Sequence, residues 1–431
     1  MTAGNTLFRR LQQLTPLLRS RLPGQIIIQY TDMCNALCPQ CGMRATESFR
    51  RSTLDLDTAK RIIDRAASNG VSALSLTGGE PLLFLEQVAE LIRHARNAGI
   101  TYTRTGTNGF LFMNHDRPDY EKRVSKIAET LARSGLYTFW ISIDSCIPAI
   151  HEQMRGLPGI IAGIEKALPI LHEHGIYPSA NLGINRNIGL DAGRNGSLSI
   201  AHPVEFHELF KDAFSRFYSF VIDMGFTIAN ACYPMSIDAN EDNGLNAAYA
   251  ATSDARLVQF TNDEKPLLFK ALFDTLPLYR SKIRIFSPRS SLYSLIRQYT
   301  VGEEYCYPCR GGTDFFFVDA KEGAAYPCGY RGDERLGKYW EINIKDLKSS
   351  ASCRKCDWEC FRDPSELMGP LAALFSEPLT AVKKFVKDRD FARLWLQDIS
   401  YFRACNFFNA EKPPDYRKLA DFLPKKPGEF Q

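Results

Sequence analysis

Short apolar runs alternate with longer amphipathic stretches from residue 25 to residue 281, which predicts parallel strands joined by crossover helices. Runs rich in β-branched and aromatic residues predict strands at Gln25–Thr31, Ala73–Thr77, Thr101–Thr105, Tyr137–Ile143, Pro178–Ile184 and Phe226–Cys232. Apolar residues at helical spacing predict helices at Asp57–Ser68, Leu85–Ala98, Tyr120–Ser134, Gly159–His174, Phe206–Met224 and Glu264–Ser281. Six β/α units are too few for an ordinary closed eight-stranded barrel. The pattern therefore predicts an α/β fold built on a partial barrel.

The pattern changes after Ser287. Residues 303–363 are rich in cysteine and turns and carry too little periodic hydrophobicity for a core, so we expect a metal to stabilise them. Helical spacing returns from Leu367 to Phe422. We expect an N-terminal amphipathic helix at 1–24, the barrel at 25–287, a small cysteine-rich domain of β-hairpin and helix at 288–366, and a helical extension at 367–431. Segments 190–203 and 238–254 are expected as long rim loops, where function tends to concentrate.

Composition narrows the class of protein. The chain has 431 residues, of which 45% are hydrophobic and 24% charged, so it can form a sizeable core. The net charge of +4 is too small to indicate a nucleic-acid partner. The N-terminal stretch lacks a long apolar run and an export signal, so we expect a reducing cytoplasm. Its alternating Leu and Arg residues fit either a helix that caps a soluble domain or one that contacts a membrane surface.

The twelve cysteines fall into three groups and three single residues. The groups are Cys34, Cys38 and Cys41; Cys306, Cys309 and Cys328; and Cys353, Cys356 and Cys360; the single residues are Cys146, Cys232 and Cys405. Spacings of two or three residues suit a metal better than a disulfide. The first group directly follows the first predicted strand. Its three thiolates can hold three irons of a four-iron cluster and leave the fourth iron open, whereas zinc would want a fourth ligand, and no histidine follows nearby.

This C-x3-C-x2-C motif resembles that of radical S-adenosylmethionine (SAM) enzymes, and companion motifs follow the next three predicted strands. They are Gly78-Gly79-Glu80, similar to the family's GGE; Thr107-Asn108-Gly109, similar to its TNG; Ser142-x-Asp144, similar to its S-x-D; and His151-x3-Arg155-Gly156, similar to its H-x3-R-G. The resemblance implies a [4Fe-4S] cluster on the three cysteines with SAM bound beside it. One departure is Gln40, which stands where many members carry an aromatic residue that packs against the adenine.

The chemistry of SAM explains these residue types. Glu80 can accept hydrogen bonds from its ammonium group, and Arg155 can pair with its carboxylate. Glycines at 78 and 79 would let the backbone approach the ligand closely. Ser142 and Asp144 occupy alternate positions and are expected on the same side of their strand.

The C-terminal cysteines predict a second centre. Cys309 and Cys328 flank an apolar run and a turn at Gly323, which predicts a β-hairpin that brings the two thiols together. The spacing up to Cys360 resembles the SPASM and twitch extensions of radical SAM enzymes, which bind auxiliary four-iron clusters. The resemblance implies one auxiliary cluster, although a second, with eight ligands or an open site, and a structural zinc both stay open. The implied ligand set is Cys309, Cys328, Cys353 and Cys356; a rival set draws on Cys306 and Cys360.

The resemblance implies an enzyme that cleaves SAM reductively to a 5′-deoxyadenosyl radical. The radical would abstract a hydrogen atom from an unactivated C–H bond, leading to oxidation, cross-linking or rearrangement of a small molecule or natural product. A flavodoxin or ferredoxin would supply electrons. Two alternatives are a maturase of a ribosomally made peptide or protein and a non-catalytic iron–sulfur electron carrier.

Residues at the ends of the fifth and sixth strands are candidates for the substrate site, because active sites of barrels lie at the carboxyl ends of their strands. Cys232 is interpreted either as a hydrogen-atom donor to a substrate radical or as a small buried side chain. The expected substrate contacts are Asn181, Asn185, Arg186 and Tyr233.

Overall fold

The computed structural model describes residues 21–39, 41, 50–189, 202–234, 245–248, 256–347, 351–376 and 378–424. Gln40, residues 1–20 and most of both predicted rim loops lie outside the described residues. The expected N-terminal helix does not reach residue 24, because residues 21–23 are not helical and the first strand begins at Gly24. Within the described part of the chain, no helix has the length and apolarity to cross a bilayer.

One open sheet forms the centre of the molecule, with the strand order β10-β9-β8-β1-β2-β3-β4-β5-β6-β7. Seven strands run parallel, as expected for crossover connections. They are β1 (Gly24–Thr31), β2 (Val71–Gly78), β3 (Tyr102–Thr107), β4 (Thr138–Ser142), β5 (Ser179–Gly183), β6 (Ile228–Cys232) and β7 (Arg284–Ile285). The six predicted strands and the partial-barrel α/β fold are confirmed. The two-residue strand β7 was not predicted, because it is too short to leave a pattern.

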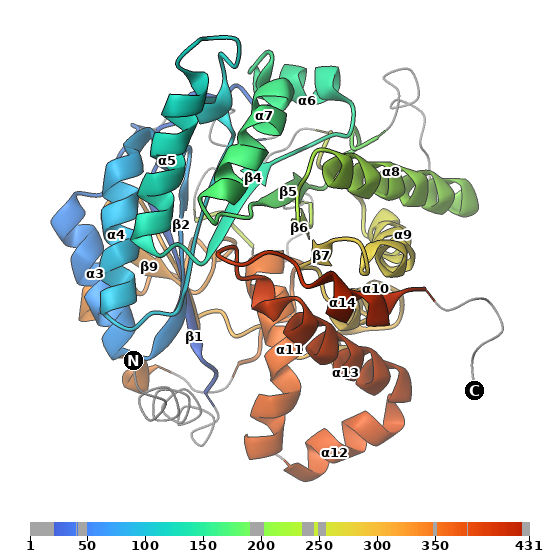
Figure 1. The fold of residues 1–431 in the computed structure, drawn as a ribbon. Helices are drawn as coiled ribbons and strands as arrows, with labels where there is room; N and C mark the ends of the chain where they lie inside the picture. Colours follow the sequence, from blue (N-terminus) through green and yellow to red (C-terminus); the bar gives the residue numbers. More distant parts are fainter. Residues whose placement is uncertain are drawn as a thin grey trace.

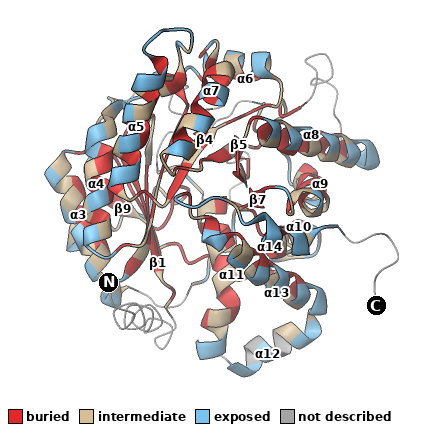
Figure 2. Ribbon diagram, viewed as in Figure 1, coloured by how far each residue is buried: buried red, intermediate tan, exposed pale blue. Residues whose placement is uncertain are grey.

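Helices cover the outer face of these strands, and Figure 1 shows α3, α4 and α5 side by side along it. The crossover helices are α3 (Leu56–Ser68), α4 (Leu85–Asn97), α5 (Tyr120–Ser134), α6 (Pro148–Arg155), α7 (Ile160–Glu173), α8 (Pro203–Asp223) and α9 (Glu264–Tyr279). Their inward sides are apolar and buried, while their outward sides are exposed (Figure 2). Ile62, Leu91 and Leu131, for example, keep no exposed surface. This burial explains why the helical periodicity located these helices to within a few residues, except for the short α6, which was not predicted.

The cysteine-rich region adds three strands to the sheet: β8 (Phe315–Val318), β9 (Ala324–Tyr326) and β10 (Gly337–Lys338). The predicted hairpin is confirmed, because β8 and β9 pair antiparallel around a turn where Gly323 has φ of +66°. Strand β8 also pairs in parallel with β1, with Phe315 opposite Gln25. The sheet therefore runs across the boundary expected at residue 287.

Five further helices follow the barrel: α10 (Arg289–Thr300), α11 (Glu359–Ser376), α12 (Pro378–Lys387), α13 (Arg389–Ala404) and α14 (Tyr416–Leu419). Helix α11 begins within the cysteine-rich region, so the boundary expected at residue 366 falls inside a single helix. Short 3₁₀ turns lie at Pro81–Phe84, Phe110–Phe112, Glu303–Tyr305, Tyr339–Glu341, Ile344–Asp346, Asn406–Phe408 and Ala420–Phe422. The segment after α13 binds the barrel where β4 and β5 begin, because the backbone of Ala410 pairs with Tyr137 and Tyr177.

Candidate functional site

The loop that carries Cys34, Cys38 and Cys41 follows β1 and is bound by segments from two other crossovers. The amides of Gly79 and Glu80 donate to the carbonyls of Thr31 and Met33, both at 2.8 Å. The amide of Leu37 donates to the carbonyl of Arg155 at 2.9 Å. Two motifs far apart in the sequence therefore fix the backbone of the cysteine loop from both sides.

Gly78 and Gly79 permit this contact. A Cβ atom on Gly78 would collide with the carbonyl oxygen of Thr31, and one on Gly79 would collide with that of Met33. Gly78 also has φ of +151°, a conformation that other residues rarely adopt. We expected these glycines to let the backbone approach a ligand. The structure shows that they let the end of β2 approach the cysteine loop, and close approach to a ligand stays a prediction.

Glu80 lies buried beside that loop. Its carboxylate accepts hydrogen bonds from the amides of Asn108, at 2.6 Å, and Leu82, at 3.1 Å. Burial raises the pKa of Glu80 to about 7 although both hydrogen bonds favour the charged form. The Asn108 side chain donates to the Asn35 side chain at 2.9 Å, directly next to Cys34. The structure thus brings the GGE and TNG motifs to the cysteine loop.

Asp144 and Arg155 form a two-pronged ion pair, in which Nε and Nη2 of Arg155 donate to the two carboxylate oxygens at 2.7 and 2.8 Å. Burial disfavours the charge of Arg155, but Asp144 and the nearby thiols of Cys38 and Cys41 outweigh it, so the pKa is raised. We expected Arg155 to pair with the carboxylate of SAM. In the structure, Nε and Nη2 bind Asp144, and pairing of Arg155 with SAM stays a prediction. Ser142, the last residue of β4, is half-buried two positions before Asp144.

The first three thiols differ in exposure: Cys34 is exposed, Cys41 half-buried and Cys38 buried. Burial raises the pKa of Cys38 to about 12 and also raises that of Cys34. The amide of Cys41 donates to the carbonyl of Cys38 at 3.2 Å, so the last two cysteines lie in one tight turn. Iron ligation would require these thiols to release their protons. Three thiols in one loop with an accessible side fit a cluster that keeps one iron open.

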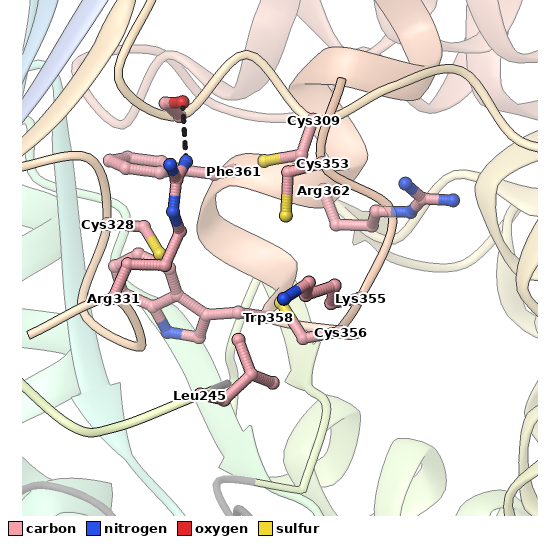
Figure 3. Close-up of a pocket in the computed structure, with 11 residues that line it drawn as sticks. Leu245, Cys309, Cys328, Arg331, Cys353, Lys355, Cys356, Trp358, Phe361 and Arg362 are labelled. Carbon is pink, nitrogen blue, oxygen red and sulfur yellow. Dashed lines mark hydrogen bonds between the residues drawn. The ribbon is translucent and has the colours of Figure 1, made fainter. Parts of the chain in front are cut away.

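A second group of thiols lines a pocket in the cysteine-rich region (Figure 3). It consists of Cys309, Cys328, Cys353 and Cys356, the set that the sequence resemblance implied. The amide of Cys309 donates to the carbonyl of Cys353 at 2.7 Å, which joins two segments 44 positions apart. Hairpin, loop and the approach to α11 thus each contribute thiols to one space.

Cations and apolar side chains complete this pocket. Arg331, Lys355 and Arg362 line it, and Arg331 donates to the carbonyl of Gly311 at 3.3 Å (Figure 3). Burial raises the pKa of Cys328 to about 12 and that of Cys309 and Cys356 above the ordinary value. Neighbouring cations favour thiolates, so this donor set fits a negatively charged iron–sulfur group.

The remaining cysteines of the region lie elsewhere. The thiol of Cys306 donates to the carbonyl of Ser294 and to the Gln298 side chain, both at 3.2 Å. Cys360 interacts electrostatically with Glu359 and Arg104. Cys405 is fully buried at the end of α13. Across the part of the chain that the structure describes, no group of three or more His, Cys, Asp or Glu residues is spaced to hold a metal ion.

Two of the expected substrate-site residues lie side by side on β5 and β6. The thiol of Cys232 donates to Oδ1 of Asn181 at 3.4 Å, and the same oxygen accepts from Nδ2 of Asn230 at 3.1 Å. Burial and the charge of Glu359 raise the pKa of Cys232 well above its ordinary value, so its thiol is protonated. A protonated thiol is what hydrogen-atom donation needs, and that role stays a prediction.

The other three expected contacts are engaged within the protein. The Asn185 amide donates to the carbonyls of Asp144 and Gly183, both at 2.8 Å. Arg186 pairs with Glu264 at 2.7 Å. The Tyr233 hydroxyl donates to Asp363 at 3.1 Å. These bonds hold the segments after β5 and β6 in place, and substrate contact by the same residues stays a prediction.

Sequence reasoning missed three polar residues of the barrel: Arg104, Asn230 and Glu359. Nδ2 of Asn230 donates to the Glu359 carboxylate at 3.0 Å, and Glu359 interacts electrostatically with Arg104. A signal was present for Arg104, since an arginine in the middle of a predicted buried strand is unusual. Glu359 gave no signal, because its position against β6 depends on how α11 folds back.

Comparison with known proteins agrees with this site. Residues 28–187 match the family described as the radical SAM superfamily. AdoMet-dependent heme synthase of Methanosarcina barkeri is 34% identical over 147 residues, which are 33% of this chain and 38% of that protein. GTP 3′,8-cyclase of Vibrio parahaemolyticus is 28% identical over 152 residues, which are 34% of this chain and 42% of that protein. The chain thus spans about two fifths of the length of these relatives.

The solved structure of anSMEcpe with bound AdoMet and the Kp18Cys peptide has a similar fold, with a TM-score of 0.50 at 15% identity. The match covers 86% of this chain and 97% of that one. Residues 28–187, which match the radical SAM superfamily, contain the cysteine loop and the motifs that surround it. Proteins of this superfamily use a [4Fe-4S] cluster and SAM.

Proposed function

We propose that this protein is a radical SAM enzyme that abstracts a hydrogen atom from an unactivated C–H bond of a small-molecule or natural-product substrate. The observation that carries the proposal is the convergence of three motifs, from the ends of β2, β3 and β4, on one cysteine loop. An electron carrier would need the thiols but not Glu80, Asn108 and Asp144 arranged around them. The names of the two curated relatives refer to small molecules, heme and GTP, which supports the substrate class.

Cys34, Cys38 and Cys41 would hold the SAM-binding cluster. When bound, this cluster and SAM supply a 5′-deoxyadenosyl radical. Glu80 would accept from the ammonium group of SAM, and its hydrogen bonds to two backbone amides hold the carboxylate in position. Asn108, Ser142 and Asp144 lie on the same side of the molecule for further contacts. Arg155 acts by orienting Asp144 and by anchoring Leu37 of the cysteine loop.

The auxiliary cluster would be held by Cys309, Cys328, Cys353 and Cys356. It would exchange electrons with the substrate or bind it. Oxidation, cross-linking and rearrangement all fit this scheme, and a flavodoxin or ferredoxin would reduce the first cluster. Cys232 would return a hydrogen atom to a substrate radical where the net reaction requires one.

The test is the iron and sulfide content of anaerobically reconstituted protein, compared with a variant that carries Cys34→Ala, Cys38→Ala and Cys41→Ala. We expect about eight irons to fall to about four. A fall from about twelve to about eight would indicate two auxiliary clusters. If the variant contained zinc where we expect its remaining iron, the prediction of an auxiliary iron–sulfur cluster would be wrong.

Enzyme activity is tested by reducing the reconstituted wild type in the presence of SAM and candidate substrates. We expect 5′-deoxyadenosine from the wild type and none from Cys34→Ala. A wild type that binds iron but forms no 5′-deoxyadenosine under any condition would favour the electron carrier. Turnover of a peptide and not of small molecules would favour a maturase.

A further inference from the structure

The strands of the barrel show an unusual alternation of burial. Side chains that point outward beneath the helices are fully buried, as at Thr105, Phe139 and Ala180. On β3 to β6, several inward-pointing positions are half-buried: Arg104, Trp140, Ser142, Asn181, Asn230 and Cys232. Inward-pointing positions of β1 and β2, such as Ile27 and Ser75, are buried. The side of the barrel interior formed by β3 to β6 therefore keeps surface that a ligand can contact.

Arg104, on β3, carries a positive charge into this space. Within the described residues its guanidinium makes no hydrogen bond and no ion pair, and its Nε atom is buried without a partner. Its neighbours include the ring of Phe286, whose centroid lies 5.6 Å from the guanidinium carbon, and the ionisable groups of Glu359 and Cys360. A guanidinium has five donors, and burying even one of them unpaired is costly. A ligand that accepts hydrogen bonds from the guanidinium of Arg104 would remove this cost.

The surroundings of Arg104 offer complementary groups. The carbonyl oxygen Oδ1 of Asn230 is also buried without a partner, and Nδ2 of the same residue is held by Glu359. Trp140 lies across Gly106, two positions along β3, where a Cβ atom would collide with the indole. The interior of the barrel therefore offers a ligand the guanidinium of Arg104, the unpaired carbonyl oxygen of Asn230 and the indole ring of Trp140.

Charge balance selects the ligand class. Burial raises the pKa of Glu359, which disfavours its negative charge, so the guanidinium of Arg104 dominates the charge of the space. A carboxylate matches a single guanidinium in charge and in planar geometry, whereas a doubly charged phosphate would keep one negative charge unpaired.

The position along the strand fits a substrate that reaches toward SAM. Arg104 precedes Asn108 of the SAM-binding motif by four residues, a distance of about 13 Å along a strand. A ligand anchored at Arg104 would extend from the interior of the barrel toward the cysteine loop.

We propose that Arg104 binds the carboxylate of the substrate inside the barrel, with Asn230 accepting a hydrogen bond from a hydroxyl or amine of the same molecule. This inference rests on the proposed function, because it assigns the substrate of that enzyme to the carboxylic acids. It adds Arg104, Asn230 and Trp140 to the candidate substrate site.

The test uses the reconstituted, SAM-loaded protein and small probes titrated by calorimetry: benzoate and succinate against their neutral amides, benzamide and succinamide. We expect the carboxylates to bind and the amides to bind at least tenfold more weakly. Arg104→Met should raise the Kd of the carboxylates at least tenfold. The matched control is Arg133→Met, which removes an arginine of the exposed face of α5 and should leave the Kd unchanged.

Thermal stability separates a binding role from a structural one. Within the described residues Arg104 makes no hydrogen bond or ion pair, and its contact with the Phe286 ring is weak. The melting temperature of ligand-free Arg104→Met should therefore lie close to or above that of the wild type. Should Arg104→Met fail to fold, Arg104→Gln, which keeps two donors without the charge, is the second variant. A lowered melting temperature for both variants overturns the proposal.

Three other results would overturn it: no carboxylate binds the wild type, the amides bind as well as the acids, or Arg104→Met binds the acids as the wild type does. Failure of this inference and failure of the proposed function can be told apart. Absence of 5′-deoxyadenosine would refute the radical chemistry while the titrations still report on the carboxylate site.

Discussion

At the scale of single residues, the site depends on polar groups that are buried and already paired. Glu80 accepts two backbone hydrogen bonds, and Asp144 holds Arg155 with both oxygens. Such groups are oriented before a ligand arrives, which lowers the cost of binding. Their ionisation then becomes sensitive to burial, and Glu80 is the clearest case.

Glu80 should make SAM binding depend on pH. Burial raises its pKa to about 7, so the neutral acid predominates below that pH and accepts more weakly from an ammonium group. We expect the Kd of SAM to rise as pH falls below 7, by up to about tenfold per unit. Equilibrium titration of reconstituted protein between pH 6 and pH 8 measures this. Glu80→Gln should bind weakly with no dependence in this range, and an equally steep dependence in that variant would contradict the assignment to Glu80.

The raised pKa of Glu80 also makes the stability of the fold depend on pH, in the direction opposite to that of SAM binding. The pKa of Glu80 in the folded protein lies above the ordinary value of a glutamate, so the folded state holds a proton that the unfolded state has released. Its contribution to stability is therefore present at acidic pH and is lost as pH rises from about 4.5 to about 7. SAM binding above pH 7 compensates for this loss, because a ligand that binds only the folded state stabilises it.

At the scale of elements, the junction between the end of β2 and the loop after β1 determines where the first cysteines lie. Two hydrogen bonds join the backbones, and glycines at positions 78 and 79 leave room for them. The family motif at this point therefore has a structural role in addition to any contact with SAM.

Gly79→Ala should disturb this junction. The added methyl group would collide with a backbone carbonyl, so the loop must shift, at a cost of about 1–3 kcal/mol of unfolding free energy. Urea unfolding of the iron-free protein measures the cost, and iron uptake should fall with it. Gly183→Ala, at the corresponding end of β5, is the control. Its Cβ would meet nothing closer than 3.9 Å, so we expect a change within about 0.5 kcal/mol. Equal effects of both substitutions would contradict this account.

At the scale of the whole molecule, the barrel and the cysteine-rich region share one sheet. Strand β8 pairs with β1 from Gln25 to Ile28, and Phe317 packs against Trp358 on the inner side. Helix α11 then places Glu359 against Asn230 of β6. Within the described residues, a continuous core crosses the domain boundary expected at residue 287.

A chain truncated after residue 287 should therefore not fold as an independent barrel. Removing β8 exposes the edge of β1 and the buried side chain of Ile27, and an exposed apolar edge strand promotes aggregation. We expect loss of soluble protein and of cooperative thermal unfolding, measured by size-exclusion chromatography and calorimetry against the full chain. A monomeric fragment 1–287 that unfolds cooperatively would show that the barrel is independent of the cysteine-rich region.

Much of the fold could be predicted because strands and helices leave local periodic signals. The burial of the long crossover helices on one face and of β1 to β6 beneath them produced the patterns that located these elements, whereas the short α6 was not predicted. The first cysteine group and its companion motifs were also readable, since each lies within a few residues directly after a strand. The ligand set of the second group came from resemblance and not from spacing.

The sequence by itself determined the order of the elements, the three-cysteine loop and the motifs that follow the strands, because each depends on neighbours along the chain. Only the tertiary structure decided that β8 pairs with β1 and that Arg155 forms an ion pair with Asp144. It also decided that Arg104 enters the barrel without a hydrogen bond or an ion pair within the described residues. These features join residues separated by up to about 290 positions. Such contacts leave no periodic signal, because their energy comes from packing and charge between segments that meet only after the chain has folded.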